Sequence, residues 1–278
     1  MQGGKIIEQK SGNSVDDWVK MATWQMIEGD SPLVATAIHD GHNLREELAD
    51  LIALEEQERL REEDPFTGVW TAVAETRLIA QRSRFEMDLN RPREKAVYLT
   101  PEDCWGLRVW KEGLSPEIVE RSLAQYDAFY IELRRLFSEL EKRFGRFVVF
   151  DIHSYNHRRN GPNSPPENPE ENPEVNVGTG TMNREKWSPI VERFMDDLRS
   201  FDFLGRKLDV RENVKFKGGN MARWTHKNFS ESGCVLALEF KKFWMDEWTG
   251  KPDKTQVEAI HQALASTVPG VLEELRKL

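Results

Sequence analysis

The stretch from Phe147 to Arg159, FVVFDIHSYNHRR, carries the strongest structural signal in the chain. Its first four residues are apolar, and the polar residues Asp151, His153 and Ser154 follow at once. A short apolar run that ends in polar residues is typical of a buried strand that is leaving a sheet. In open α/β sheets, ligands bind at the carboxyl ends of such strands. We therefore expect His153 to face a ligand, with Asp151 or Ser154 orienting its ring, unless it only caps the strand through a hydrogen bond.

The composition indicates an ordinary globular protein. The 278 residues can form one large α/β domain or two small ones, with ample material for a core. The net charge of −9 argues against a nucleic-acid partner, which would need a basic surface. Two cysteines, Cys104 and Cys234, are too few for a disulfide framework, and they fit a reducing compartment. No apolar run approaches the roughly 20 residues that span a bilayer, and residues 1–10 lack the apolar stretch of a secretory signal. We expect a cytoplasmic protein that binds neither nucleic acid nor membrane.

Helices and strands are expected in alternating order, which predicts an α/β fold. Residues 1–30 are expected to form an extension, and residues 31–278 a single catalytic domain. The expected strands, besides the one at 147–150, are 32–38, 84–89, 208–217 and 234–238. The expected helices are a short one at 16–26, an amphipathic one at 44–61, one capped by Ser115 and ended by Gly145, and others at 188–198, 255–265 and 271–277. Residues 98–111 are expected to form a lid or surface loop, and the proline-rich segment 158–176 no regular element.

A second histidine stretch follows the first predicted strand. His39 comes directly after that strand and is either a metal ligand or a histidine in an exposed loop. The acidic run from Glu62 to Asp64 lies between the two histidine stretches in sequence. Acidic runs at helix ends are usually solvated, but this one could supply a carboxylate ligand to the same metal.

Several arginines cluster in this acidic chain: Arg82, Arg84, Arg91 and Arg93. Arginine presents a rigid fork that matches a carboxylate with two parallel hydrogen bonds, and Asn90 can add a further donor. The cluster therefore suggests an anionic small molecule as ligand. The alternative is that these arginines form structural ion pairs with Asp88.

Glu239 ends the last predicted core strand, so we do not expect it to be a simple surface charge. It could instead form a salt bridge with Lys241 or Lys242.

Two histidines and one carboxylate form a common catalytic zinc set, in which the metal lowers the pKa of a bound water. A separate glutamate can accept the water proton, and an arginine can hold a substrate carboxylate. Together these parts describe metal-assisted hydrolysis of an amide whose amine product is an amino acid.

The chain resembles the N-formylglutamate amidohydrolase family over roughly residues 33–250. The Asp-Leu-Asn-Arg and Asp-Ile-His-Ser pair is the most specific part of this match. The matching segments are 38–41 (IHDG), 62–64 (EED), 83–91 (SRFEMDLNR), 151–154 (DIHS), 216–219 (FKGG), 238–239 (LE) and 245–250 (MDEWTG). The family is itself similar to zinc carboxypeptidases and aspartoacylases. The resemblance implies a phosphorylase/hydrolase-like three-layer α/β/α sandwich around a mixed, twisted sheet.

The resemblance also implies roles for individual residues. His39, Asp64 and His153 match the metal ligands, with Glu63 as an alternative to Asp64. His42 stands where the zinc carboxypeptidases have a glutamate, and it is a possible extra ligand. Glu239 matches the general base. The implied substrate-binding residues are Asn90, Arg91, Arg84 and Arg223.

The implied activity is zinc-dependent hydrolysis of an N-acyl, most simply an N-formyl, amino acid such as N-formylglutamate. A peptidase or amidase that acts on a carboxylate-bearing peptide or cell-wall fragment is an alternative. A binding protein that keeps the fold without turnover is another, but it would have no need for a base beside the metal.

Overall fold

The computed structural model describes residues 23–278, and the bounds of its elements are as follows. The strands are β1 (Trp24–Ile27), β2 (Leu33–Ala37), β3 (Thr76–Ala80), β4 (Phe147–Tyr155), β5 (Val175–Gly178), β6 (Val210–Glu212) and β7 (Gly233–Lys241). The α-helices are α2 (Glu46–Ala49), α3 (Glu56–Glu62), α4 (Thr67–Trp70), α5 (Pro116–Phe144), α6 (Ser188–Ser200), α7 (Asn220–Asn228) and α8 (Lys254–Lys277). Three 3₁₀ turns complete the set: η1 (Thr71–Val73), η2 (Arg93–Lys95) and η3 (Pro101–Asp103).

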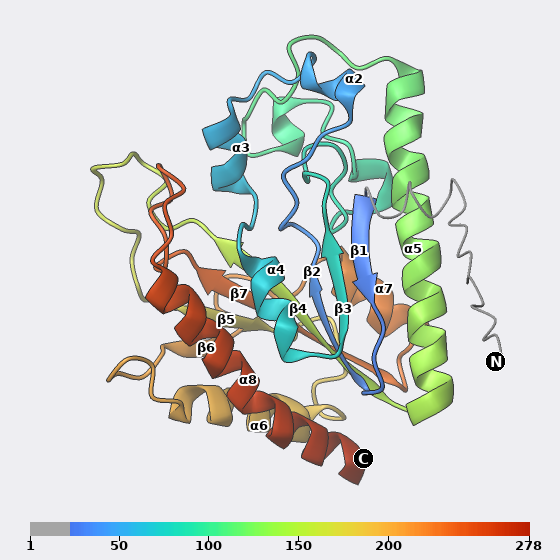
Figure 1. The fold of residues 1–278 in the computed structure, drawn as a ribbon, viewed down its shortest axis with the longest axis vertical. Helices are drawn as coiled ribbons and strands as arrows, with labels where there is room; N and C mark the ends of the chain where they lie inside the picture. Colours follow the sequence, from blue (N-terminus) through green and yellow to red (C-terminus); the bar gives the residue numbers. More distant parts are fainter. Residues whose placement is uncertain (1–22) are drawn as a thin grey trace, which may run out of the picture.

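The strands form one seven-stranded sheet in the order β1-β3-β2-β4-β7-β5-β6. The strands β3, β2, β4 and β7 run parallel, and β4 and β7 lie at the centre of the sheet. β1 pairs antiparallel with β3, and β5 pairs antiparallel with β7, so the sheet is mixed. The parallel strands bring their carboxyl ends to one edge, where the candidate site lies (Figure 1).

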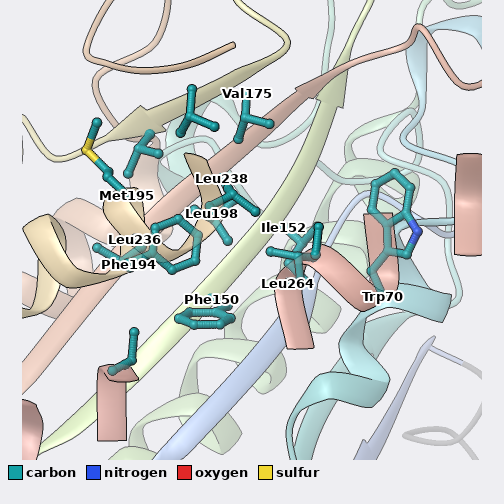
Figure 2. Packing of buried hydrophobic residues seen from close by; sticks show 14 of the residues in the cluster. Trp70, Phe150, Ile152, Val175, Phe194, Met195, Leu198, Leu236, Leu238 and Leu264 are labelled. Carbon is teal, nitrogen blue, oxygen red and sulfur yellow. The ribbon is translucent and has the colours of Figure 1, made fainter. Parts of the chain in front are cut away.

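Helices cover both faces of the sheet. Alternate residues of β4 enter two different cores: Phe150 and Ile152 pack with α4, α6 and α8, whereas Phe147 and Val149 pack with α5 and α7. Figure 2 shows the first of these cores, with Phe150 and Ile152 near Trp70 and Leu264. Because both faces of a parallel sheet are buried, its strands read as continuous apolar runs. The predicted three-layer α/β/α sandwich with a mixed sheet is confirmed.

The long helix α5 has the ends that its sequence predicts. The Ser115 hydroxyl accepts a hydrogen bond from the Ile118 N–H at 3.4 Å, and Pro116 occupies the first turn. The helix stops at Gly145, which adopts a positive φ of 75°. The helix expected at 188–198 and the strands expected at 32–38 and 234–238 are also present.

Two predictions in the first half of the chain are wrong. The strand expected at 84–89 is absent, and β3 lies earlier in the chain; the Glu86 N–H instead bonds back to the Ser83 carbonyl at 3.0 Å. The single helix expected at 44–61 is two short helices, α2 and α3. Between them the Ala53 N–H bonds to the Val109 carbonyl at 2.8 Å, because this segment packs against residues 109–111 instead of continuing the helix.

Three more predictions are corrected, two of them in the second half of the chain. The strand expected at 208–217 is only three residues long, because Asn213 adopts a positive φ of 55° that turns the chain. The two helices expected at the end of the chain are one helix, α8, which continues through Pro269. An internal proline costs about 3 kcal/mol, and packing of α8 against α6 offsets that cost. The expected surface loop at 98–111 buries Tyr98 and Trp110.

The predicted helix at 16–26 is wrong for Trp24 to Met26, which belong to β1; its residues 16–22 lie outside the described part. The segment 158–176 is irregular as predicted, except that β5 begins at Val175. The division into an extension and one catalytic domain stays a prediction. No helix between residues 23 and 278 is long and apolar enough to cross a membrane.

Candidate active site

Three predicted metal ligands meet at the carboxyl edge of the sheet. His39 follows β2, His153 lies near the end of β4, and Asp64 follows α3. One ligand atom from each residue lies within 4.8 Å of the other two, and all three side chains are buried. Both Nδ1 atoms face Asp64 Oδ2, at 3.4 Å from His39 and 3.1 Å from His153. Two imidazole nitrogens and one carboxylate oxygen are a donor set that suits a divalent metal such as zinc.

The outer ring nitrogens of the two histidines contact buried carboxylates. His39 Nε2 lies 2.7 Å from Asp88 Oδ1, and His153 Nε2 lies 3.1 Å from Asp151 Oδ2. Metal-binding histidines commonly have such a carboxylate partner, which fixes the ring and its tautomer. Ser154 was also expected to orient the His153 ring. Its hydroxyl instead donates a hydrogen bond to Asp64 Oδ1 at 3.1 Å. The arrangement therefore fits a metal through its outer contacts as well as its donor atoms.

The field of these carboxylates favours a positive charge at the centre. Burial alone would lower the pKa of His153, but Asp151 and Asp64 raise it well above its usual value. Burial alone would raise the pKa of Asp64, but hydrogen bonds from His153 and His39 hold it well below its usual value. The same carboxylates would favour a bound cation over an empty, neutral site.

The two alternative ligands lie outside this group. Glu63 and Asp64 are neighbours in an extended stretch after α3, so their side chains point to opposite sides. Glu63 Oε2 lies 2.5 Å from His42 Nδ1, and Glu63 also accepts a hydrogen bond from the Ser83 hydroxyl. The structure thus pairs Glu63 with His42, away from His39 and Asp64.

A buried lysine fixes the segment that carries Asp64. Lys242 is 1% exposed, and its Nζ donates to the carbonyl oxygens of Arg61 and Glu63, each at 2.6 Å. Its ammonium therefore bridges the end of β7 to the residues that precede Asp64. Burial lowers the pKa of Lys242.

A cavity of about 260 Å³ opens beside the three ligands. Asn90, Arg91 and Arg84, three of the predicted substrate-binding residues, line it. Arg84 is committed to structure, because its Nη2 donates to Asp88 Oδ2 at 2.8 Å. Arg91 is freer: its nearest carboxylate oxygen is Asp88 Oδ2, 3.7 Å from its Nε. Arg84 therefore forms the structural ion pair with Asp88 that was the alternative, whereas a role for Arg91 in binding an anionic ligand stays a prediction.

The double glycine after β6 shapes the wall beside Asn90. Gly218 adopts a φ of +109°, which other residues rarely adopt. A Cβ at Gly219 would lie 2.2 Å from the Asn90 side chain. Arg223, the fourth predicted substrate contact, does not line the cavity; it is exposed on α7 and donates to the Gly218 carbonyl at 3.0 Å.

Glu239 faces the cavity from β7 and is in register with His153 of β4. Among residues 23–278 its carboxylate makes no hydrogen bond or ion pair, so the expected alternative of a bridge to Lys241 or Lys242 is absent. Burial raises the pKa of Glu239 to about 7, in the range of a group that exchanges protons at neutral pH.

The sequence interpretation missed three residues that line the cavity: Asn156, Arg159 and Lys242. Asn156 and Arg159 lie in the stretch from Phe147 to Arg159, but its pattern assigned no role to them. Lys242 was considered only as a partner for Glu239. No periodicity or spacing marks these three, because the fold of the loops brings them to the site.

Comparisons with known proteins identify the family and support the fold. A family model described as N-formylglutamate amidohydrolase matches residues 31–243. The crystal structure of N-formylglutamate amidohydrolase from Ralstonia eutropha JMP134 superimposes with a TM-score of 0.72 at 17% identity, covering 92% of this chain and 99% of that one. The structure of gene product Atu2144 from Agrobacterium tumefaciens gives a TM-score of 0.61 at 15% identity, covering 90% and 96%. No curated protein matches the chain significantly in sequence.

At these identities the solved structures support the fold, whereas the family model covers most of the sequence, including every segment from His39 to Glu239 that builds the site. The chain therefore belongs to the N-formylglutamate amidohydrolase family.

Proposed function

We propose that this protein hydrolyses the amide bond of an N-formyl amino acid, with N-formylglutamate as the first substrate to test. One observation carries the proposal: the His39, Asp64 and His153 group shares a single small cavity with an unpaired acid, Glu239, and an available guanidinium, Arg91. Membership of the N-formylglutamate amidohydrolase family supports the same reaction.

His39, Asp64 and His153 would hold one divalent metal, which we propose to be zinc. When bound, such a metal supplies Lewis acidity that acidifies water and polarises a carbonyl oxygen. Asp88 and Asp151 would keep the two histidine rings in the orientation that binding needs.

Glu239 would accept a proton from the attacking water and deliver it to the nitrogen of the leaving amine. Its raised pKa of about 7 suits both transfers, and it has no other partner in the described chain. Arg91, with Asn90 beside it, would bind the substrate carboxylate. Arg84 would contribute mainly by holding Asp88, and Arg223 would act only after a movement of α7.

The cavity volume favours a small substrate over a peptide or cell-wall fragment, since about 260 Å³ is close to the lower limit of small-molecule pockets. Glu239 argues against a binding protein without turnover, because an unpaired buried carboxylate is costly and serves no binding role there. Two free, buried cysteines are compatible with the proposed cytoplasmic location.

The test is release of formate from a panel of N-formyl amino acids by protein loaded with one zinc per chain. Metal-dependent turnover that chelation abolishes and zinc restores would support the proposal. Absence of turnover on the whole panel, with full metal content, would remove it.

A further inference from the structure

Arg159 brings a partly free guanidinium to the cavity of the candidate site. The residue lies at the start of the proline-rich segment 158–176, which the proposed reaction does not use, and it lines the cavity. Its side chain is 41% exposed, and its Nη1 donates to Glu62 Oε2 at 3.3 Å. Its Nε and Nη2 donate no hydrogen bond to residues 23–278. The edge of the fork that these two nitrogens form is therefore open to a ligand.

The buried Glu62 does not neutralise this wall of the cavity, because its carboxylate serves two arginines. Its Oε1 lies 3.4 Å from Arg61 Nε, while its Oε2 accepts from Arg159. One carboxylate therefore faces two guanidinium groups. This grouping leaves one positive charge over, in a protein whose net charge is −9. A second anion at the open edge of Arg159 would balance it.

The backbone that carries Arg159 is held in place on its N-terminal side. The Arg158 N–H donates to the buried Glu247 carboxylate at 3.1 Å, and the Arg158 carbonyl accepts from Trp248 Nε1 at 3.0 Å. The Glu167 N–H bonds to the His157 carbonyl at 2.7 Å, which closes the base of the loop. Arg159 therefore stands on a fixed frame, which is what a preorganised recognition group requires.

Arg91 and Arg159 line different parts of the cavity. The nearest carboxylate to Arg91 is that of Asp88. Arg159 contacts Glu62 instead. Arg84 links these two anchors, since its Nη2 donates to Asp88 Oδ2 at 2.8 Å and its Nη1 to the Glu62 carbonyl at 3.3 Å. A carboxylate bound by Arg91 would therefore leave Arg159 free for another.

On the strength of the proposed function, we infer that Arg159 is a specificity-determining residue that binds a carboxylate on the side chain of the substrate, while Arg91 binds the α-carboxylate. The open edge of the Arg159 fork matches a carboxylate with two parallel hydrogen bonds. The preferred substrates would then be N-acyl derivatives of acidic amino acids. A neutral side-chain amide offers the guanidinium one acceptor oxygen in place of two and no charge, so it would bind more weakly.

The experiment measures binding, so that it is separate from turnover. Zinc-loaded Glu239→Gln protein is titrated by calorimetry with N-formylglutamate and with N-formylglutamine, which keeps the shape and the α-carboxylate but has a neutral side chain. We expect N-formylglutamate to bind at least about tenfold more tightly. Adding Arg159→Gln should weaken N-formylglutamate alone and bring the two affinities to within about twofold of each other.

Three further variants separate recognition from a structural role. Arg91→Gln should weaken both ligands alike, because both keep the α-carboxylate. Glu62→Gln releases Arg159 from its protein partner, so it should retain or increase the preference for N-formylglutamate. Arg158→Gln is the matched control: Arg158 is the exposed neighbour, but it lines a different pocket, so neither affinity should change.

Equal weakening of the two ligands by Arg159→Gln would overturn the inference, since Arg159 would then only tie its segment to Glu62. So would a parent protein that binds both ligands equally well or binds neither. Lys217 also lines the cavity, and a preference lost in Lys217→Met but kept in Arg159→Gln would overturn it too. Turnover by the wild type is scored separately: if no formate is released while the affinity ratio depends on Arg159, the proposed function falls and the role of Arg159 in binding stands.

Discussion

Replacing Glu239 by glutamine should separate catalysis from stability. Glutamine keeps the shape of the side chain and removes the proton acceptor. The Glu239 carboxylate makes no hydrogen bond or ion pair in the described chain, so the substitution breaks none. We expect metal content close to one per chain and a melting temperature no lower than that of the wild type.

The loss of activity follows from the role of the group. General acid–base residues typically contribute about 10²–10⁴-fold to the rate. Because Glu239 would both take the water proton and supply the proton of the leaving amine, we expect a fall in kcat of at least 100-fold. The assay is formate release from N-formylglutamate with zinc-loaded protein, beside elemental analysis and thermal unfolding.

Glu86→Gln is the matched control. Glu86 is also buried, but its Oε2 accepts the Arg45 N–H at 2.8 Å and its Oε1 accepts from Gln125 at 3.2 Å. Glutamine can satisfy only one of these donors, which leaves a mismatch worth about 1–3 kcal/mol. The control should therefore lose stability and keep its turnover, since Glu86 does not line the cavity. Near-normal turnover by zinc-bound Glu239→Gln would refute the assignment.

Three further predictions follow from the contacts above. His153→Ala should lower the metal content to well below one per chain, whereas His42→Ala should retain it; full occupancy in the first variant, by elemental analysis, would contradict the ligand set. Arg91→Ala should lose a contact with the substrate carboxylate worth about 2–5 kcal/mol. Arg91→Lys should not restore the activity, because a point charge cannot reproduce the bidentate fork of the guanidinium. Equal turnover of an N-formyl amino acid and its carboxamide by the wild type would exclude carboxylate recognition by Arg91. The Nε2 of His226 accepts the Val235 N–H, and burial lowers the pKa of this histidine to about 4, so the folded state resists its protonation. The contribution of His226 to the free energy of unfolding should be complete above about pH 6.5 and fall by about 3 kcal/mol towards pH 4. Urea unfolding of His226→Gln should lack this dependence on pH.

The order of helices and strands could be predicted because each central element carries a complete local signal. In β4 the apolar run is buried on both faces, so Phe147 to Phe150 read as a strand without any knowledge of its neighbours. In α5 the cap at Ser115 and the stop at Gly145 are both local features. His39, His153 and Glu239 were found for the same reason, since each follows or ends such a strand.

Elements whose limits depend on distant partners could not be predicted. The helix expected at 44–61 is interrupted because its middle pairs with residues 109–111, about 60 positions away. Pro269 predicts a break in α8, but packing against α6 keeps the helix continuous. The apolar pattern at 84–89 suggests a strand, but Asp88 is buried there among His39, Arg84 and Tyr98.

The site shows the same division. The sequence by itself determined which residue types were available, because imidazoles, carboxylates and arginines stand in the segments that leave the sheet. Only the tertiary structure decided between Asp64 and Glu63, because the backbone directions after α3 send neighbouring side chains to opposite sides. It alone brought Lys242 and Asn156 to the cavity. Neither residue has a partner within its own segment that would mark it. The role of Lys242 is visible only from the two carbonyl oxygens, of Arg61 and Glu63, to which its ammonium donates.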